Sequence, residues 1–292
     1  MKKIVIAAAL AAASIAASAQ VTVYGMVREY VDNTKVGGVS TTQMVDDTSR
    51  IGIKASETLG NGLTARIVVE TGFAANDPAT NADTKLGNRQ STVGLASKNG
   101  SVDFGRKTNT FFEAIDANDV FTTDYGSIAG DIHSVRTVRS GNAVFVNYTY
   151  GPVTVAYDRT ASGLGGEATS YSATGKLGPV AANIARFEQG VDKSTVLGVR
   201  GSYAGTNLFA STSFDTSIFG DVRGTMVGAS RQLTVMPIVL KASYGVKTGD
   251  VRAFALGADY ALSKRTGVSV AYRNVNDFVD TRQLGLGLTH RF

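Results

Sequence analysis

The alternation of apolar and polar residues is the feature of this sequence that most restricts its fold. From residue 20 to the end the repeat has a period of two, and turn residues interrupt it roughly every 10 to 15 residues. In the stretch SRIGIKASETLGNGLTARIVVETGF, for example, Ile51, Ile53, Ile67 and Val69 share one face. No long helical repeat is present. The sequence therefore predicts an all-β chain.

The second face of the same stretch is charged, because it carries Arg50, Lys54, Arg66 and Glu70. Strands of this kind need lipid or protein on one side and water on the other. The outer surface of a soluble sheet and the lumen of a barrel both supply that water. The two alternatives differ in how the strands are connected.

The connections alternate between tight turns and more variable loops. Tight turns are expected at LGNG (59–62), SKNG (97–100) and YGP (150–152), with longer junctions near 32–45, 74–84, 108–139 and 275–281. This alternation is typical of a transmembrane antiparallel β-barrel, in which an even number of strands leaves no unpaired edge in lipid. A soluble β-sandwich is the alternative. Sixteen strands are expected, at residues 21–31, 46–56, 62–73, 85–97, 101–107, 142–150, 153–161, 168–177, 180–188, 194–204, 207–216, 222–233, 238–247, 251–262, 265–274 and 282–292.

The N-terminus indicates export. MKKIVIAAALAAASIAASAQ has the order of a signal peptide, and we expect residues 1–19 to be removed by cleavage after Ala19. The remaining domain, 20–292, contains no run of about 18 apolar residues that would form a transmembrane helix. It also has no cysteine, so an exported domain of this size must be stabilised by its sheet without disulfides.

The charge pattern argues against a role on nucleic acid. The formal net charge is +5, and two of the lysines, Lys2 and Lys3, lie in the segment expected to be removed. No basic run, zinc-ligand spacing or basic helix is present. No motif for a metal or another cofactor is found, although calcium at Asp46 and Asp47 stays open. A mild basic surplus favours small anions as solutes.

Three stretches in order, SRIGIKASETLGNGLTARIVVETGF, LGNRQSTVGLASKNGSVDFGRK and the terminal LGLGLTHRF, resemble the Gram-negative general diffusion porins of the neisserial and burkholderial type. The resemblance implies a 16-stranded barrel in the outer membrane, assembled as a homotrimer in lipid. It also implies a third external loop, here 108–139, that folds into the lumen. Small hydrophilic solutes and inorganic ions would cross such a channel passively.

The resemblance further implies a constriction between wall arginines and loop acids. Arg50, Arg89 and Arg139 fall where wall arginines are expected, and Glu70 falls where a wall glutamate is expected. Parity alone adds Arg28 and Arg66, while Met26 stands where the family usually has a lysine. The acids of the loop are Glu113, Asp116, Asp119 and Asp124. A mild anion preference is the expected consequence.

Other functions fit these residues less well. An outer-membrane enzyme needs a catalytic set of side chains, and the sequence has two histidines. His133 could line the pore, and His290 is expected on the same strand face as Leu288. A plugged structural barrel needs bulky inward residues, whereas positions such as Gly52 and Gly257 are small. A substrate-specific channel on the same fold is the main alternative.

Overall fold

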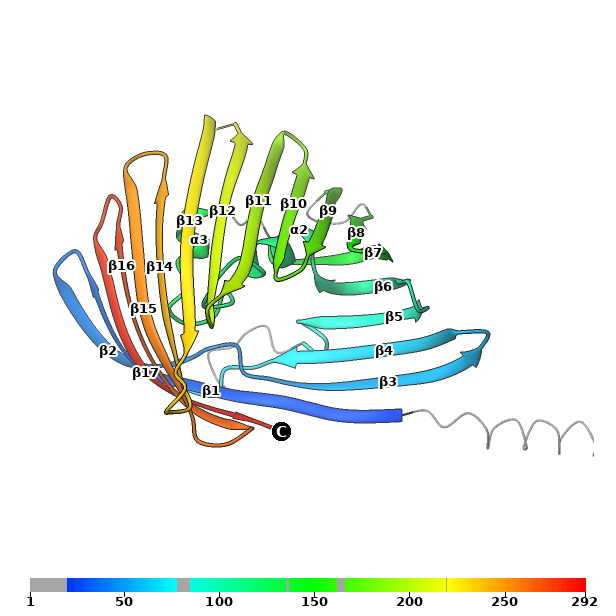
Figure 1. Cartoon of the computed structure of the whole chain (residues 1–292), viewed down its shortest axis with the longest axis horizontal. Coiled ribbons are helices and arrows are strands. Elements are labelled where there is room, and N and C mark those ends of the chain that lie inside the picture. Colours follow the sequence, from blue (N-terminus) through cyan, green and yellow to red (C-terminus); the bar gives the residue numbers. More distant parts are fainter. Residues whose placement is uncertain (1–19, 78–84, 135–136, 162–165, 219) are drawn as a thin grey trace, which may run out of the picture.

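The described chain forms a closed antiparallel barrel. The structure, a computed structural model, describes residues 20–292 except 78–84, 135–136, 162–165 and 219. The expected signal peptide, 1–19, lies outside the described residues. The strands surround an interior that contains α2 (Thr110–Asp116) and α3 (Ala129–Ile132), as Figure 1 shows.

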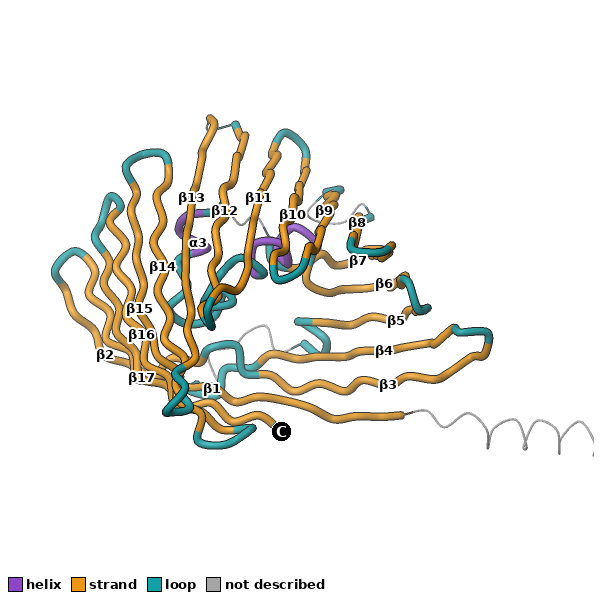
Figure 2. Tube along the Cα trace, in the orientation of Figure 1, coloured by secondary structure: helices purple, strands orange, loops and turns teal. Residues whose placement is uncertain are grey.

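The described residues form 17 strands, and Figure 2 shows how much of the chain they occupy. Their bounds are β1 (Gln20–Val36), β2 (Val39–Asp46), β3 (Arg50–Gly60), β4 (Leu63–Gly72), β5 (Gln90–Ala96), β6 (Gly100–Thr108), β7 (Arg139–Tyr150), β8 (Val153–Thr160), β9 (Ala168–Leu177), β10 (Val180–Gln189), β11 (Asp192–Tyr203), β12 (Thr206–Ser217), β13 (Gly220–Gln232), β14 (Ile238–Lys247), β15 (Val251–Ala261), β16 (Thr266–Asn276) and β17 (Thr281–Arg291).

Two of these strands share one position in the barrel. One edge of β1 pairs with β17 along its outer part, which closes the ring. The other edge pairs first with β3, from Gln20 opposite Ser56 to Met26 opposite Arg50, and then with β2, from Glu29 opposite Asp46 onward. Since β2 and β3 lie end to end beside β1, the 17 described strands fill 16 positions. The expected 16-stranded barrel is confirmed.

Three local expectations were wrong. The junction at 32–45 is not a loop, because β1 and β2 continue to a turn at Gly37 and Gly38, both with positive φ. The junction at 275–281 is short, since β16 ends at Asn276 and β17 begins at Thr281. Residues 85–89 form a turn before β5 instead of its first residues. Polar side chains misled the first expectation: Asn33 and Thr42 form a cross-strand hydrogen bond of 2.8 Å.

The outer face of the barrel is apolar. Ile51 and Leu286 are 45% and 58% exposed, as are many residues of the same parity, which is the pattern of strands that contact hydrocarbon. Neither helix of the described residues is long and apolar enough to cross a membrane. The buried apolar cluster lies inside the ring, where residues of the segment between β6 and β7 pack against β9–β16.

Candidate pore constriction

The segment between β6 and β7, residues 109–138, is called the inner loop here. Asn109 caps the N-terminus of its first helix, since its side chain accepts a hydrogen bond from Phe112 N at 2.7 Å. The same side chain donates a hydrogen bond to Thr137 O at 2.7 Å, which joins the two ends of the loop. Helix α2 buries Phe111 and Ile115. The Phe111 ring lies 6.1 Å from the ring of Phe187 on β10. Capping and packing therefore seat the loop on the inner wall.

The second half of the inner loop fits into glycine notches in the wall. A Cβ atom on Gly257 of β15 would lie 2.7 Å from the Phe121 ring, and one on Gly245 of β14 would lie 2.5 Å from Ile132. Contacts this close leave no space for a larger residue. Some small inward residues, which had favoured an open lumen, therefore exist to receive the loop.

The tip of the inner loop is bound to β1 and the adjoining turn. Asp124 forms an ion pair with Arg28 Nη1 at 2.6 Å, and the same Nη1 lies 2.8 Å from a carboxylate oxygen of Asp47. The Tyr125 ring stacks on Tyr30 with centroids 3.9 Å apart, and Tyr125 N donates to Asp47 at 3.0 Å. Arg28 is 7% exposed. It therefore holds the loop in place and offers little charge to the pore.

The four loop acids have different surroundings. Asp119 is 1% exposed and accepts hydrogen bonds from Phe121 N at 3.1 Å and Thr123 N at 2.8 Å, so it shapes the loop. Asp124 is paired with Arg28. Asp116 accepts from the Thr123 hydroxyl at 2.7 Å. Glu113 is exposed. Among the described residues, Glu113 and Asp116 form no ion pair with a basic side chain, whereas Asp124 does.

The basic wall is organised around Glu70. Arg89 Nε donates to one Glu70 oxygen at 2.8 Å, while Arg50 Nε lies 3.7 Å from the other. The Tyr24 hydroxyl donates to Glu70 at 3.1 Å. Strand register brings these groups together, because Glu70 lies opposite Gly52 on β3 and Gln90 on β5. Two guanidinium groups therefore share one carboxylate.

Arg139 adds a third guanidinium to this wall. Arg50, Arg89 and Arg106 are all close enough for their charges to act on it. No carboxylate of the described residues lies within ion-pair distance of Arg139. The wall therefore carries more positive charge than Glu70 neutralises.

Arg106 was missed by the sequence analysis, because it shares the parity of the exposed Phe104. The register between β6 and β7 shifts between Gly105 and Lys107, and Arg106 Nε donates to the Asn88 carbonyl at 2.7 Å. Such a bulge redirects a side chain. The GRK sequence contains a glycine that could signal a bulge, but nothing in it shows which way the arginine turns.

Arg66 lies apart from the wall cluster. It makes a two-point contact with Asp103 on β6, with Nε 2.8 Å from one oxygen and Nη2 2.6 Å from the other. Lys107 Nζ also lies 3.2 Å from Asp103. Arg66 is therefore neutralised by a partner that strand parity alone did not indicate.

His133 does not line the pore. It is 0% exposed, and its Nδ1 and Nε2 lie 3.0 Å from Ser213 Oγ and 2.9 Å from Ser211 Oγ, both on β12. Burial and the nearby charge of Lys247 lower the pKa of His133 to about 4. A neutral imidazole thus fastens the end of the inner loop to the wall. His290 lies on the exposed face and bonds Thr266 at 2.9 Å.

A closed 16-stranded barrel with an apolar outer belt, an internal loop and a basic inner wall defines a channel of the outer membrane. The chain matches the Gram-negative porin family over residues 7–278, and it belongs to that family.

Similar proteins agree with this assignment. The major outer membrane protein P.IB of Neisseria gonorrhoeae is 29% identical, over 93% of this chain and 92% of its own length. An outer membrane porin protein of Bordetella pertussis is 33% identical over 49% of this chain and 44% of its own length. An anion-selective porin from Comamonas acidovorans shares the fold with a TM-score of 0.82, at 20% identity, covering 94% of this chain and all of that one. The protein is an outer-membrane porin that forms a passive diffusion channel.

Proposed function

We propose that the channel selects weakly for small hydrophilic anions at a constriction between the basic wall and the inner loop. Arg50, Arg89 and Arg139 form the positive side, Glu70 partly neutralises it, and Glu113 and Asp116 supply negative charge from the loop. The observation that carries the proposal is that Arg50 and Arg89 share the carboxylate of Glu70, while Arg139 beside them has no carboxylate of the described residues within ion-pair distance. Porins of similar fold include one described as anion-selective.

The mechanism follows from electrostatics in a narrow, protein-walled space. Guanidinium groups stay charged at all relevant pH values, and low-dielectric walls concentrate their field in the lumen. An anion entering the constriction exchanges part of its water for arginine donors, while a cation is repelled from the same wall and attracted to the loop acids. Large or apolar solutes are excluded by size and by loss of water. Because no step forms a covalent bond, transport remains diffusive.

Reversal potentials in a salt gradient across planar bilayers test the wall. Wild type should prefer chloride over potassium, and the Arg50→Glu plus Arg89→Glu variant should prefer potassium. The Arg159→Glu variant is a control, because Arg159 is 51% exposed and pairs with Glu167 outside the lumen. Cation preference in the wild type that is unchanged in the double variant would contradict the proposal.

Single-channel conductance tests the loop. Replacing residues 110–134 by a short glycine-serine link should raise conductance, because the segment fills part of the lumen. An unchanged conductance in a folded variant would show that the loop does not limit flow. Saturable block of the wild type by one class of solute would instead favour a substrate-specific channel.

Assembly and processing are part of the same proposal. We propose a homotrimer in the outer-membrane lipid and removal of residues 1–19 after Ala19. Unheated electrophoresis of detergent-extracted protein should show a band near three times the monomer mass, and intact-mass measurement should show Gln20 as the first residue. A monomer band at every temperature would contradict the trimer.

A further inference from the structure

A second group of basic residues lies on the inner wall, nearer to the tight turns than the constriction. The alternation along each strand places these side chains on the face that lines the lumen. Lys54 follows Gly52 by two residues on β3, and Lys241 lies opposite Gly257 on β15. We call the group the basic vestibule. Its members are Lys54, Arg66, Lys176, Arg200, Lys241 and Arg291.

Acids of the described residues neutralise two members of the basic vestibule. Arg66 pairs with Asp103 at 2.6 Å, and Lys241 pairs with Asp259 at 2.7 Å. For the other four, no carboxylate within ion-pair distance is found among the described residues. Their positive charge therefore acts on whatever enters this end of the lumen.

The contacts of two unpaired members show where they point. Lys54 Nζ lies 5.7 Å from the centroid of the Tyr24 ring, and Tyr24 in turn bonds Glu70 of the constriction. Arg200 Nη1 lies 3.5 Å from Asn183 Oδ1, and Asn183 bonds Asn118 of the inner loop. Both cations therefore face the lumen below the loop.

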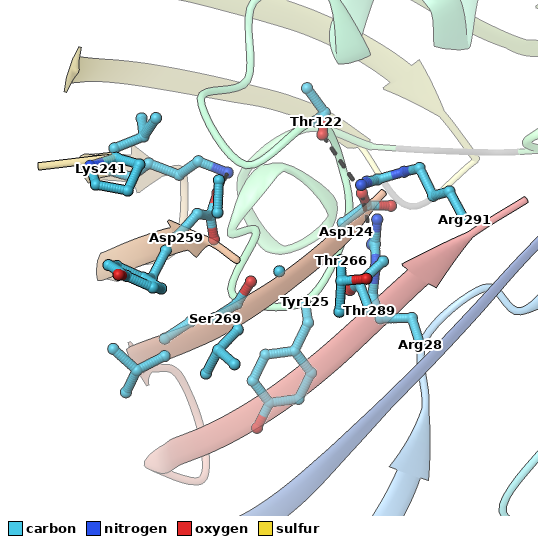
Figure 3. A pocket seen from close by; sticks show the side chains of 18 of the residues that line it. Arg28, Thr122, Asp124, Tyr125, Lys241, Asp259, Thr266, Ser269, Thr289 and Arg291 are labelled. Atoms are coloured by element: carbon cyan, nitrogen blue, oxygen red, sulfur yellow. Dashed lines mark hydrogen bonds and ion pairs between the residues drawn. The ribbon is translucent and has the colours of Figure 1, made fainter. Parts of the chain in front are cut away.

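Four members of the basic vestibule line two cavities in the wall. Lys176 and Arg200 line a cavity of about 280 Å³ between β9 and β12. Arg291 and Lys241 line one of about 350 Å³ between the inner loop and the last four strands, which Figure 3 shows from close by. The unpaired cations are thus distributed around the vestibule, and an ion passing through it meets them on several sides.

The lumen on the other side of the inner loop has a different balance. Arg28, which lines the same cavity as Arg291, is paired with Asp47 and Asp124. Near the loop ends of β16 and β14, Arg273 pairs with Asp131 at 3.1 Å, and Lys247 Nζ donates to the Asp131 carbonyl oxygen at 3.2 Å. Glu113 and Asp116 add negative charge. The pore therefore becomes more positive along its axis toward the end that carries the tight turns.

We propose that the basic vestibule is a second anion-selective region in series with the constriction, and that it makes the channel rectify ionic current. The inference rests on the proposed anion channel and adds a direction to it. A region with fixed positive charge is filled mainly with anions, whereas a nearly neutral region holds both signs equally. Joining the two in one pore makes the ion content depend on the polarity of the voltage.

The direction follows from this junction. When the loop side is positive, anions move from the turn side through the basic vestibule into the rest of the pore, where they gather with cations, and the current is large. With the opposite polarity, anions must enter from the side that does not concentrate them, and the pore is depleted. The effect needs long-range charge, so it should be clear at 0.1 M salt, where the Debye length is about 10 Å, and fade at 1 M, where it is about 3 Å.

The experiment is a current–voltage measurement on single channels of known orientation. The chain has no cysteine, so Asn99→Cys in the SKNG turn provides one thiol that a membrane-impermeant reagent labels from one side only. The expected ratio of currents at equal and opposite voltages is at least about 1.5 at 0.1 M potassium chloride and close to 1 at 1 M. Equal currents at 0.1 M would overturn the proposal.

A charge-removal variant identifies the residues responsible. Lys54→Gln, Lys176→Gln and Arg200→Gln combined should bring the ratio at 0.1 M close to 1. Arg231→Gln is the matched control: it removes a cation opposite Leu240, a residue 46% exposed on the outer face, and should leave the ratio unchanged. Heat-shifted electrophoresis confirms that each variant folds. A triple variant that rectifies like wild type would refute the assignment.

Failure of this inference can be told apart from failure of the proposed constriction. The reversal potential reports the selectivity set by Arg50 and Arg89, and the current ratio at zero gradient reports the asymmetry along the axis. Anion preference without rectification would overturn the role of the basic vestibule and leave the constriction standing.

Discussion

Glu70→Gln gives the sharpest test of the basic wall, because it removes a charge and keeps the shape. The glutamine oxygen can still accept from Arg89 Nε, which lies 2.8 Å from one native carboxylate oxygen, and the glutamine amide nitrogen can donate to the Tyr24 hydroxyl, which lies 3.1 Å from the other. One positive charge then becomes uncompensated. For an ion about 5 Å away in water, the Coulomb energy is about 0.8 kcal/mol. Screening at 0.1 M salt reduces it to about 0.5 kcal/mol.

That energy has a measurable consequence. Local anion concentration should rise about twofold and local cation concentration should fall about twofold, so the chloride-to-potassium permeability ratio should increase about fivefold. Reversal potentials at 0.1 M mean salt measure it. Glu167→Gln is the control, because Glu167 is 57% exposed and pairs with Arg159 at 2.7 Å. A ratio that does not change in Glu70→Gln, or that shifts toward potassium, would refute the reasoning.

Three further predictions concern the inner loop. Phe121→Ala should raise single-channel noise and lower the thermal midpoint of unfolding, since emptying a buried phenylalanine site costs about 3–5 kcal/mol; a variant as quiet and as heat-stable as wild type would contradict the packing at Gly257. Gly257→Leu should have a similar effect from the wall side, whereas Gly249→Leu, at a turn with open space around it, should not perturb the loop although its positive φ strains the turn. The folded pKa of His133, about 4, lies below its unfolded value, so the stability that the neutral ring provides is present above about pH 6.5 and is lost as pH falls toward 4. Thermal midpoints measured from pH 7 to 4 should therefore fall more in wild type than in His133→Asn, and equal slopes would exclude the histidine as the cause.

The barrel could be predicted because its determinants are local. Alternation places Ile51 and Ile53 in lipid whatever their partners, and a turn such as LGNG reverses the chain from its own residues. The strand count follows from adding such units. One error fell where polar residues occur in strands, at Asn33 and Thr42, which pair across a hairpin that extends beyond the apolar belt.

The different roles of the charged residues in the lumen could not be predicted in the same way. Parity gave Arg28, Arg50 and Arg66 the same description, but Arg28 holds the loop through Asp124 and Arg66 is neutralised by Asp103. Asp119 is a structural residue of the loop, and Arg106 reaches the wall through a bulge. Each outcome depends on which side chain lies across the lumen or on the next strand.

A period of two and the intervening turns act within a few residues of chain, so the amino-acid sequence alone predicts a barrel of 16 strand positions with charged residues inside. Which of those charges remain uncompensated depends on the folded arrangement of the strands and the inner loop. A charge in a pore is neutralised by whatever carboxylate folding brings within about 4 Å, and that distance is set by strand register and by the course of the inner loop. The difference between Arg66 and Arg139 is therefore a property of the folded channel.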